Sequence, residues 1–142
     1  MTNITSFMTA DHKQCDDSFV EFENAIADKN WPLLTTVWNE FSKKLMHHFE
    51  MEEKVLFPAF EEATGITEGP TSVMRSEHLQ MRGLIAVLEK AIESKDDEEC
   101  QGIAETLMIM MQQHNMKEEQ MLYPMSDQHI DSDPVVAAMK EV

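Results

Sequence analysis

The 142-residue sequence is poor in residues that break a helix, with only four glycines and five prolines. Few such residues mean few turns and long elements, which favours helices over a many-stranded β-sandwich. A chain of this length is expected to form one domain rather than two independent cores. The composition therefore predicts a single domain over residues 1–142, built from a small number of helices.

Basic residues are scarce as well. The chain has 11 Lys and Arg against 27 Asp and Glu, which gives a formal net charge of −16 at pH 7. Such a surface repels phosphate groups, so neither nucleic acid nor an anionic membrane is an expected partner. We interpret the charge as an acidic, well-solvated surface.

Long apolar runs and cysteine pairs are missing. The longest stretch without Asp, Glu, Lys or Arg covers residues 106–116, whereas a membrane-spanning helix needs about 20 apolar residues. No basic segment precedes an apolar stretch near the N-terminus, so we expect no secretory signal and a cytoplasmic location. Cys15 and Cys100 form no Cys-x-x-Cys pair and are expected to be free thiols.

Three turn signals divide the chain. Asn30 is followed by Pro32, as is typical of a helix start. Residues 64–72 carry two glycines and a proline, which is typical of a loop. Asp96 and Glu99 have the spacing of a capping box, with Asp in place of Ser or Thr. The predicted helices between these turns cover about 7–28, 31–63, 71–94 and 97–127.

Short connections make successive helices antiparallel neighbours. We therefore predict an all-α fold, an up-down-up-down antiparallel four-helix bundle over about residues 7–127. Residues 128–142 are expected to be a short C-terminal tail, with a further helical turn or two after Pro134.

Each predicted helix carries an inward stripe at intervals of three and four residues. The stripes are Met8, His12, Cys15, Phe19, Phe22, Ile26; Phe41, Leu45, His48, Glu52, Val55, Ala59; Met74, His78, Met81, Ile85, Leu88, Ile92; and Leu107, Met111, His114, Glu118, Met121, Met125. Every stripe contains a histidine, and two also contain a glutamate, which is unusual for positions that face a core.

The two halves of the sequence repeat with an offset of 66 residues. The segments 48–58 and 114–124 share the frame H-x-x-x-E-E-x-x-L-F/Y-P, and His12 aligns with His78. In both halves the two inward histidines are 36 residues apart. A single His-x-x-x-Glu is a weak signal, but its duplication with matched spacing is a strong one. His47 and His129 lie outside the repeat, and we expect them to play no part in a site.

The turns bring the repeated residues to one level. In an antiparallel hairpin, residues at one level are equidistant from the turn. The midpoint of His12 and His48 is Asn30, and the midpoint of their repeat partners is Asp96. The glutamate of the second helix and the histidine of the third are equidistant from Gly65. The six side chains expected in one cross-section are His12, His48, Glu52, His78, His114 and Glu118.

Four imidazoles and two carboxylates in an apolar core would each cost about 1–3 kcal/mol or more if left unpaired. A metal site removes this cost, and imidazole with carboxylate suits iron, manganese or zinc. Six ligands are too many for one tetrahedral ion. They suit two ions, each with two histidines, bridged by the two carboxylates. No Glu-x-x-His occurs in the sequence, which argues against a ferritin-like di-iron oxidase.

At these residues the sequence resembles the hemerythrin-like family, the HHE cation-binding domain. The resemblance extends over about residues 7–127 and involves His12, His48, Glu52, Glu53, His78, His114, Glu118 and Glu119. It implies a non-haem di-iron centre with an oxo or hydroxo bridge. It also implies that the partner is oxygen or a similar diatomic molecule, bound for storage, delivery or sensing without turnover.

The sequence departs from the oxygen carriers of this family at one position. They have a further histidine one turn before the third-helix ligand, where this chain has Met74. Four-histidine members are linked to redox sensing, peroxide chemistry and repair of damaged iron centres. The alternative function is therefore a di-iron redox enzyme or repair factor that acts on peroxide or nitric oxide, or donates iron to damaged iron–sulfur centres. In the fourth helix the resemblance also leaves Glu119 as an alternative to Glu118.

Overall fold

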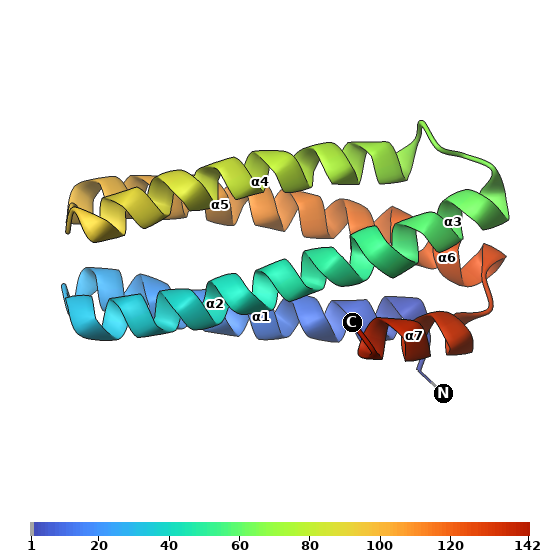
Figure 1. Cartoon of the computed structure of the whole chain (residues 1–142), viewed down its shortest axis with the longest axis horizontal. Coiled ribbons are helices and arrows are strands. Elements are labelled where there is room, and N and C mark those ends of the chain that lie inside the picture. Colours follow the sequence, from blue (N-terminus) through green and yellow to red (C-terminus); the bar gives the residue numbers. More distant parts are fainter. Residues whose placement is uncertain (1) are drawn as a thin grey trace.

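The structure, a computed structural model, describes residues 2–142, and within this range it contains helices and no strand (Figure 1). The elements are α1 (Ile4–Ala27), α2 (Trp31–Met51), η1 (Glu52–Leu56), α3 (Phe57–Thr64), α4 (Pro70–Glu93), α5 (Asp97–Lys117), η2 (Glu118–Leu122), α6 (Tyr123–His129) and α7 (Ser132–Lys140), where η marks a π-helical turn. The all-helical prediction is confirmed. None of the described helices is both long and apolar enough to cross a membrane.

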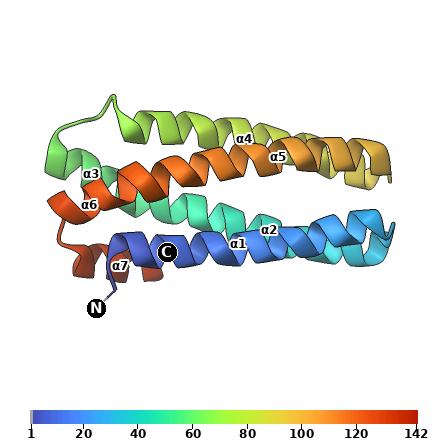
Figure 2. The same ribbon diagram turned by 180° about the vertical axis from the view of Figure 1, so that it is seen from behind.

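The π-helical turns join their neighbours without a break, so α2, η1 and α3 form one helical segment, as do α5, η2 and α6. Figures 1 and 2 show α1 lying along α2, and α4 lying along α5, from two opposite sides. The four predicted helices correspond to α1, α2–η1–α3, α4 and α5–η2–α6, with ends that differ by a few residues.

The two tight turns, which are related by the sequence repeat, have the same local structure. Asn30 accepts a hydrogen bond at Oδ1 from the Leu33 backbone N–H at 3.3 Å, and Asp96 accepts one from Glu99 N–H at 3.1 Å. The lysine before each cap is in the left-handed conformation, with φ of 52° at position 29 and 53° at position 95. The positions of these two helix caps were therefore predicted correctly. The capping box is only half formed, because the Asp96 N–H bonds to the Ala91 carbonyl and not to the Glu99 side chain.

Asp127 connects the two ends of the chain. Its carboxylate accepts hydrogen bonds from the backbone N–H groups of Ile4 and Thr5 at 2.8 and 3.0 Å, and from the Ser132 hydroxyl at 2.7 Å. Burial by itself would raise the pKa of Asp127, but the hydrogen bonds from Thr5 and Ser132 outweigh it and lower the pKa. A negative charge at the start of α1 also interacts favourably with the helix dipole.

The core consists of two apolar clusters. The larger cluster lies towards the two tight turns and includes Cys15, Phe19, Phe22, Trp38, Phe41, Met81 and Met111. The smaller cluster lies towards the loop between α3 and α4 and includes Met8, Met51, Phe57, Phe60, Met74, Tyr123 and Met139. The histidines and glutamates of the inward stripes lie near the boundary between the two clusters.

The predicted stripes are right before the π-helical turns, and after them the most buried positions lie one residue later than predicted. Every position of the first and third stripes is buried. In the fourth stripe, however, Met121 is 57% exposed, while Leu122 and Tyr123 are buried. The second stripe shows the same change, because Leu56 and Phe57 are buried in place of the predicted Val55. A π-helical turn contains one extra residue, so the inward face moves forward by one position.

The prolines at the ends of the repeated frame account for these turns. Proline has no N–H, and its ring clashes with the carbonyl four residues earlier in an α-helix. Just before Pro58, the Phe57 N–H bonds to the Glu52 carbonyl five residues back. Just before Pro124, the Tyr123 N–H bonds to the Glu118 carbonyl in the same way.

The C-terminal tail is more ordered than predicted. Instead of a turn or two after Pro134, α7 begins at Ser132 and continues to Lys140. Pro134 is in the first turn of this helix, where backbone N–H groups have no partner within the helix. Val136 and Met139 are buried, and α7 packs alongside α1 and η1 (Figure 1).

We predict that Met139→Ala destabilises the fold by about 2–5 kcal/mol, since it removes a fully buried side chain from the smaller cluster. Glu141→Ala, at the exposed residue that follows α7, should change the free energy of unfolding by less than about 0.5 kcal/mol. Urea unfolding of both variants at matched metal content measures the difference. Equal stability of the two variants would mean that α7 does not pack on the core.

Candidate metal centre

The six side chains predicted from the repeat lie in one buried layer. They are His12, His48, Glu52, His78, His114 and Glu118. His12 is 3% exposed and each of the other five is 1% exposed or less. Imidazole and carboxylate groups rarely lie this deep in a core without a partner that compensates for the loss of water.

Glu118 lies between the two halves of the repeat. Its Oε1 is 3.1 Å from His12 Nε2 and 3.3 Å from His114 Nε2, and it is 4.0 Å from His48 Nε2. One carboxylate oxygen therefore faces histidines from α1, α2 and α5.

Glu52 occupies the related position. Its Oε1 is 3.0 Å from His78 Nε2 and 3.5 Å from His48 Nε2. The imidazole rings form one pair within each half of the sequence, with centroids 4.6 Å apart for His12 and His48 and 5.0 Å apart for His78 and His114. Two sets of close donor atoms result, one around each pair, and Glu118 belongs to both.

Each of the four imidazoles has its Nε2 turned into the layer and its Nδ1, the outer nitrogen, in contact with a further carboxylate outside the layer. The Nδ1–oxygen distances are 2.6 Å for His12–Glu119, 2.6 Å for His48–Asp11, 2.6 Å for His78–Glu53 and 2.8 Å for His114–Glu77. Asp11 and Glu77 are related by the repeat, and so are Glu53 and Glu119. Each of these residues is next in sequence to one of the six inner side chains, yet holds a histidine on a different helix. This pattern cross-connects the long helices around the layer.

The outer contacts bear on the choice between Glu118 and Glu119. Glu119 is half-buried, and its carboxylate accepts a hydrogen bond from the outer nitrogen of His12. Glu118 is fully buried, and its Oε2 has no hydrogen-bond partner. The geometry therefore favours Glu118 as the inward carboxylate of this helix.

Two of the outer carboxylates also bind a cationic side chain. Arg82 donates to both oxygens of Glu53, at 2.8 and 3.0 Å. Lys117 donates to Glu77. Burial would raise the pKa of Glu53, but hydrogen bonds from Arg82 and His78 lower it. Both cations belong to the half of the layer around the second histidine pair, so the two halves differ in charge outside the layer.

If all four imidazoles are neutral, none of them supplies a proton between its inner nitrogen and the carboxylate oxygens of the layer. An outer carboxylate accepts the Nδ1–H of each neutral imidazole, which leaves a lone pair on each Nε2. These lone pairs face carboxylate oxygens that are also acceptors. His114 Nε2 and Glu118 Oε2 are buried without any hydrogen-bond partner. A bound cation would give these atoms a common partner, and imidazole with carboxylate is a donor set that suits iron. The residues present therefore fit a metal centre.

Two of the inner histidines have raised pKa values in the metal-free layer. Burial would lower the pKa of His48, but the charge of Glu52 and the hydrogen bonds to Asp11 and Glu118 raise it to about 10. Burial would likewise lower the pKa of His114, but Glu118 raises it to about 9. Protons and a metal would thus compete for the same Nε2 atoms.

Tyr123 is a site residue that the sequence analysis missed. Its hydroxyl donates to Glu52 Oε2 at 2.7 Å and lies 3.0 Å from Glu118 Oε1. It is also 3.1 Å from His12 Nε2 and 3.4 Å from His48 Nε2. The available signal was the F/Y position of the repeated frame, where the halves differ and where the only tyrosine of the chain stands.

The remaining histidines and the cysteines lie outside the layer. His47 and His129 are exposed, and His47 Nε2 lies 3.1 Å from the Val142 carbonyl oxygen. Cys15 and Cys100 are free and buried. Burial raises the pKa of the Cys15 thiol to about 12 and that of Cys100 to about 11, which suits a packing role.

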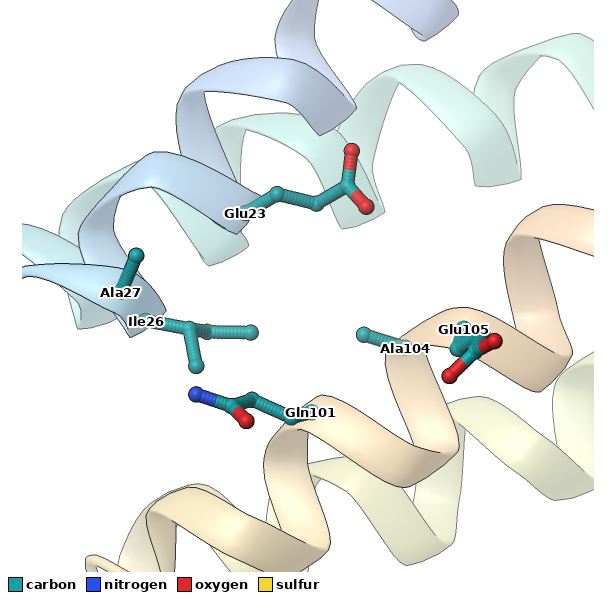
Figure 3. A pocket seen from close by; sticks show the side chains of 6 residues that line it. All are labelled: Glu23, Ile26, Ala27, Gln101, Ala104 and Glu105. Carbon is teal, nitrogen blue, oxygen red and sulfur yellow. The ribbon is translucent and has the colours of Figure 1, made fainter.

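A surface hollow between α1 and α5 is separate from the layer (Figure 3). It measures about 290 Å³ and is lined by Glu23, Ile26, Ala27, Gln101, Ala104 and Glu105. Glu23 follows His12 by eleven residues, which is about 16 Å along a helix. The hollow contains none of the six predicted side chains.

The comparison with protein families agrees with this geometry. The family model described as hemerythrin HHE cation binding domain matches residues 3–126. That range includes all six buried histidines and glutamates of the layer. Comparisons with curated proteins and with solved structures gave no match.

We predict that Asp11→Ala weakens metal binding by about 10- to 100-fold, because His48 loses the partner that fixes its orientation. Asp17→Ala is the matched control, since Asp17 is exposed and pairs only with Lys13. Competition with a chromophoric chelator measures both affinities. Equal affinities for the two variants would show that the outer carboxylate does not support the site.

A second prediction concerns protons. At pH 8 the metal-free protein holds a proton on both His48 and His114, because their pKa values are about 10 and about 9. Metal binding requires neutral imidazole, so loading at pH 8 should release at least about two protons per chain, and fewer as the pH rises through 9 and 10. Calorimetric titration in buffers with different ionisation heats measures this number. Release of no protons at pH 8 would contradict the prediction.

Proposed function

Since the chain belongs to the hemerythrin HHE cation-binding domain family, we propose that it is a non-haem di-iron protein that binds oxygen or a similar diatomic molecule. The observation that carries the proposal is the buried layer itself. Its imidazole nitrogens and carboxylate oxygens face one another, and two of them have no partner.

Each iron ion would be held by the histidine pair of one half. His12 and His48 form one pair, and His78 and His114 form the other. Glu118 faces histidines of both pairs. Glu52 also faces both, since its Oε1 lies 3.5 Å from His48 Nε2 and 3.0 Å from His78 Nε2. These contacts support the proposal that both carboxylates would bridge the two ions. The oxo or hydroxo bridge between the ions is proposed from the family alone. When bound, iron supplies the change of oxidation state and the open coordination position that a diatomic ligand requires.

The chain's own residues prepare this layer. The outer carboxylates accept the Nδ1–H of each imidazole and so turn the Nε2 lone pair inward. Phe49 stacks on His78 with ring centroids 3.9 Å apart, and Phe57 lies on the same ring at 5.5 Å. The two apolar clusters lie on either side of the layer along the helices. Aromatic rings and methionines exclude water there, which favours a small apolar ligand over water.

For the architecture, we propose the up-down-up-down antiparallel four-helix bundle expected from the sequence, within a single domain. The tight turns at Asn30 and Asp96 and the loop after Gly65 support it, since each connects a helix to the next with few residues. Helix α7, which buries Val136 and Met139, is then an addition to one end of the bundle.

The test starts from anaerobic protein grown with iron and then chemically reduced. Elemental analysis should approach two irons per chain. Exposure to air should produce a visible absorption spectrum that reverses when oxygen is removed. Irreversible bleaching or steady consumption of peroxide or nitric oxide would instead favour the redox enzyme. A content of one iron per chain would contradict the di-iron assignment.

Glu52→Ala is the most direct variant, because Glu52 faces histidines of both pairs. We predict that it lowers the iron content by more than one ion per chain. Glu50→Ala is the matched control, since the Glu50 side chain is 47% exposed on the same helical segment and pairs with Lys54. If both variants hold as much iron as the unmodified protein, Glu52 is not a ligand.

A further inference from the structure

The Tyr123 hydroxyl lies among the donor atoms of only one histidine pair. It is 3.1 Å from His12 Nε2 and 3.4 Å from His48 Nε2, and it contacts Glu52 Oε2 and Glu118 Oε1. Tyr123 is fully buried, and its ring centroid is 5.5 Å from that of His12. A single oxygen atom thus has four donor atoms of the layer within 3.4 Å.

The other half of the layer has no such oxygen. The repeat partner of Tyr123 is Phe57, and the centroid of its ring lies 5.5 Å from that of the His78 ring. The Arg75 guanidinium lies over the Phe57 ring, 5.2 Å from its centroid. Phenylalanine offers no atom that can bind a metal. The two histidine pairs, so similar in sequence, therefore differ by one donor.

The π-helical turn puts Tyr123 in this position. Tyr123 follows Glu118 by five residues, which in an α-helix would point it about 140° away from the glutamate. The i to i+5 hydrogen bond from Tyr123 N–H to the Glu118 carbonyl brings the two side chains to the same face.

We propose that Tyr123 Oη is a further ligand of the metal held by His12 and His48, so that the two irons differ. The proposal rests on the di-iron function proposed above. Tyrosine is an established iron ligand in proteins. On coordination the O–H bond breaks and an O–Fe bond forms. The oxygen keeps the electron pair, and the proton passes first to Glu52 Oε2, the present acceptor, and then to solvent. No oxidation state changes in this step.

This extra ligand decides where a diatomic molecule can bind. The phenol oxygen takes a coordination position beside His12 and His48. The ion held by His78 and His114, where Phe57 offers no donor atom, would then keep a position open. Tyr123 would thus make the two irons unequal by adding a ligand to the ion beside His12 and His48. A fifth histidine at position 74 would do the same by adding a ligand to the other ion.

The experiment uses the oxidised, iron-loaded full chain. A ferric ion bound to phenolate gives a charge-transfer band in the visible region, and resonance Raman excitation in that band enhances the vibrations of the phenolate ring. Because the chain has one tyrosine, growth on ring-deuterated tyrosine labels this residue alone. We expect ring modes that shift on deuteration. Two bound irons without such modes would overturn the inference and leave the di-iron function intact.

A pair of variants completes the test. Tyr123→Phe keeps the ring but should lose the band, with iron content either unchanged or lower by up to one ion per chain. Trp38→Phe is the control, and it should keep the band. Trp38 belongs to the larger cluster, and this substitution also removes one aromatic hydrogen-bond donor, the Nε1–H that binds Glu89 at 3.3 Å. An unchanged band in Tyr123→Phe would overturn the inference. Absence of iron from the unmodified protein would overturn the proposed function, and the inference with it.

Discussion

A shortage of protons in one buried layer governs this structure. Four imidazole nitrogens point at carboxylate oxygens in a fully buried layer, and the outer carboxylates accept hydrogen bonds from the Nδ1–H groups. Acceptors that face one another in a low dielectric are unfavourable unless a cation lies between them. In the metal-free protein the protons on His48 and His114 provide this positive charge, and in the loaded protein metal ions would provide it. The rest of the fold holds these groups in place.

The outer carboxylates connect this local chemistry to the fold. Each one is next in sequence to an inner residue but binds an imidazole on another helix, so a small shift of any long helix would break contacts on two others. Asp11, for example, is next to His12 on α1 but holds His48 on α2. Arg82 and Lys117 then stabilise two of the four carboxylates. The helices are therefore positioned by polar contacts in the layer as well as by the two apolar clusters.

Much of this could be predicted from residue types and spacing. The stripes of α1 and α4 were right at every position, because both helices are regular from end to end. The turn positions followed from Asn30, Gly65 and Asp96, whose local conformations depend on the residues themselves. With the turns fixed, equidistance brought the six histidines and glutamates to one level. The repeat made this conclusion strong, since chance does not duplicate a spacing.

The sequence by itself determined the helices, the turns and the six inward residues, because these depend on contacts between neighbours and on a constant period. The tertiary structure decided what lies beyond the π-helical turns. There the period changes, so that Tyr123 turns inward and Met121 turns outward. It also decided that Glu119 holds His12 from outside the layer, and that α7 packs on the core. These features depend on residues far apart in sequence, whose meeting no local pattern specifies.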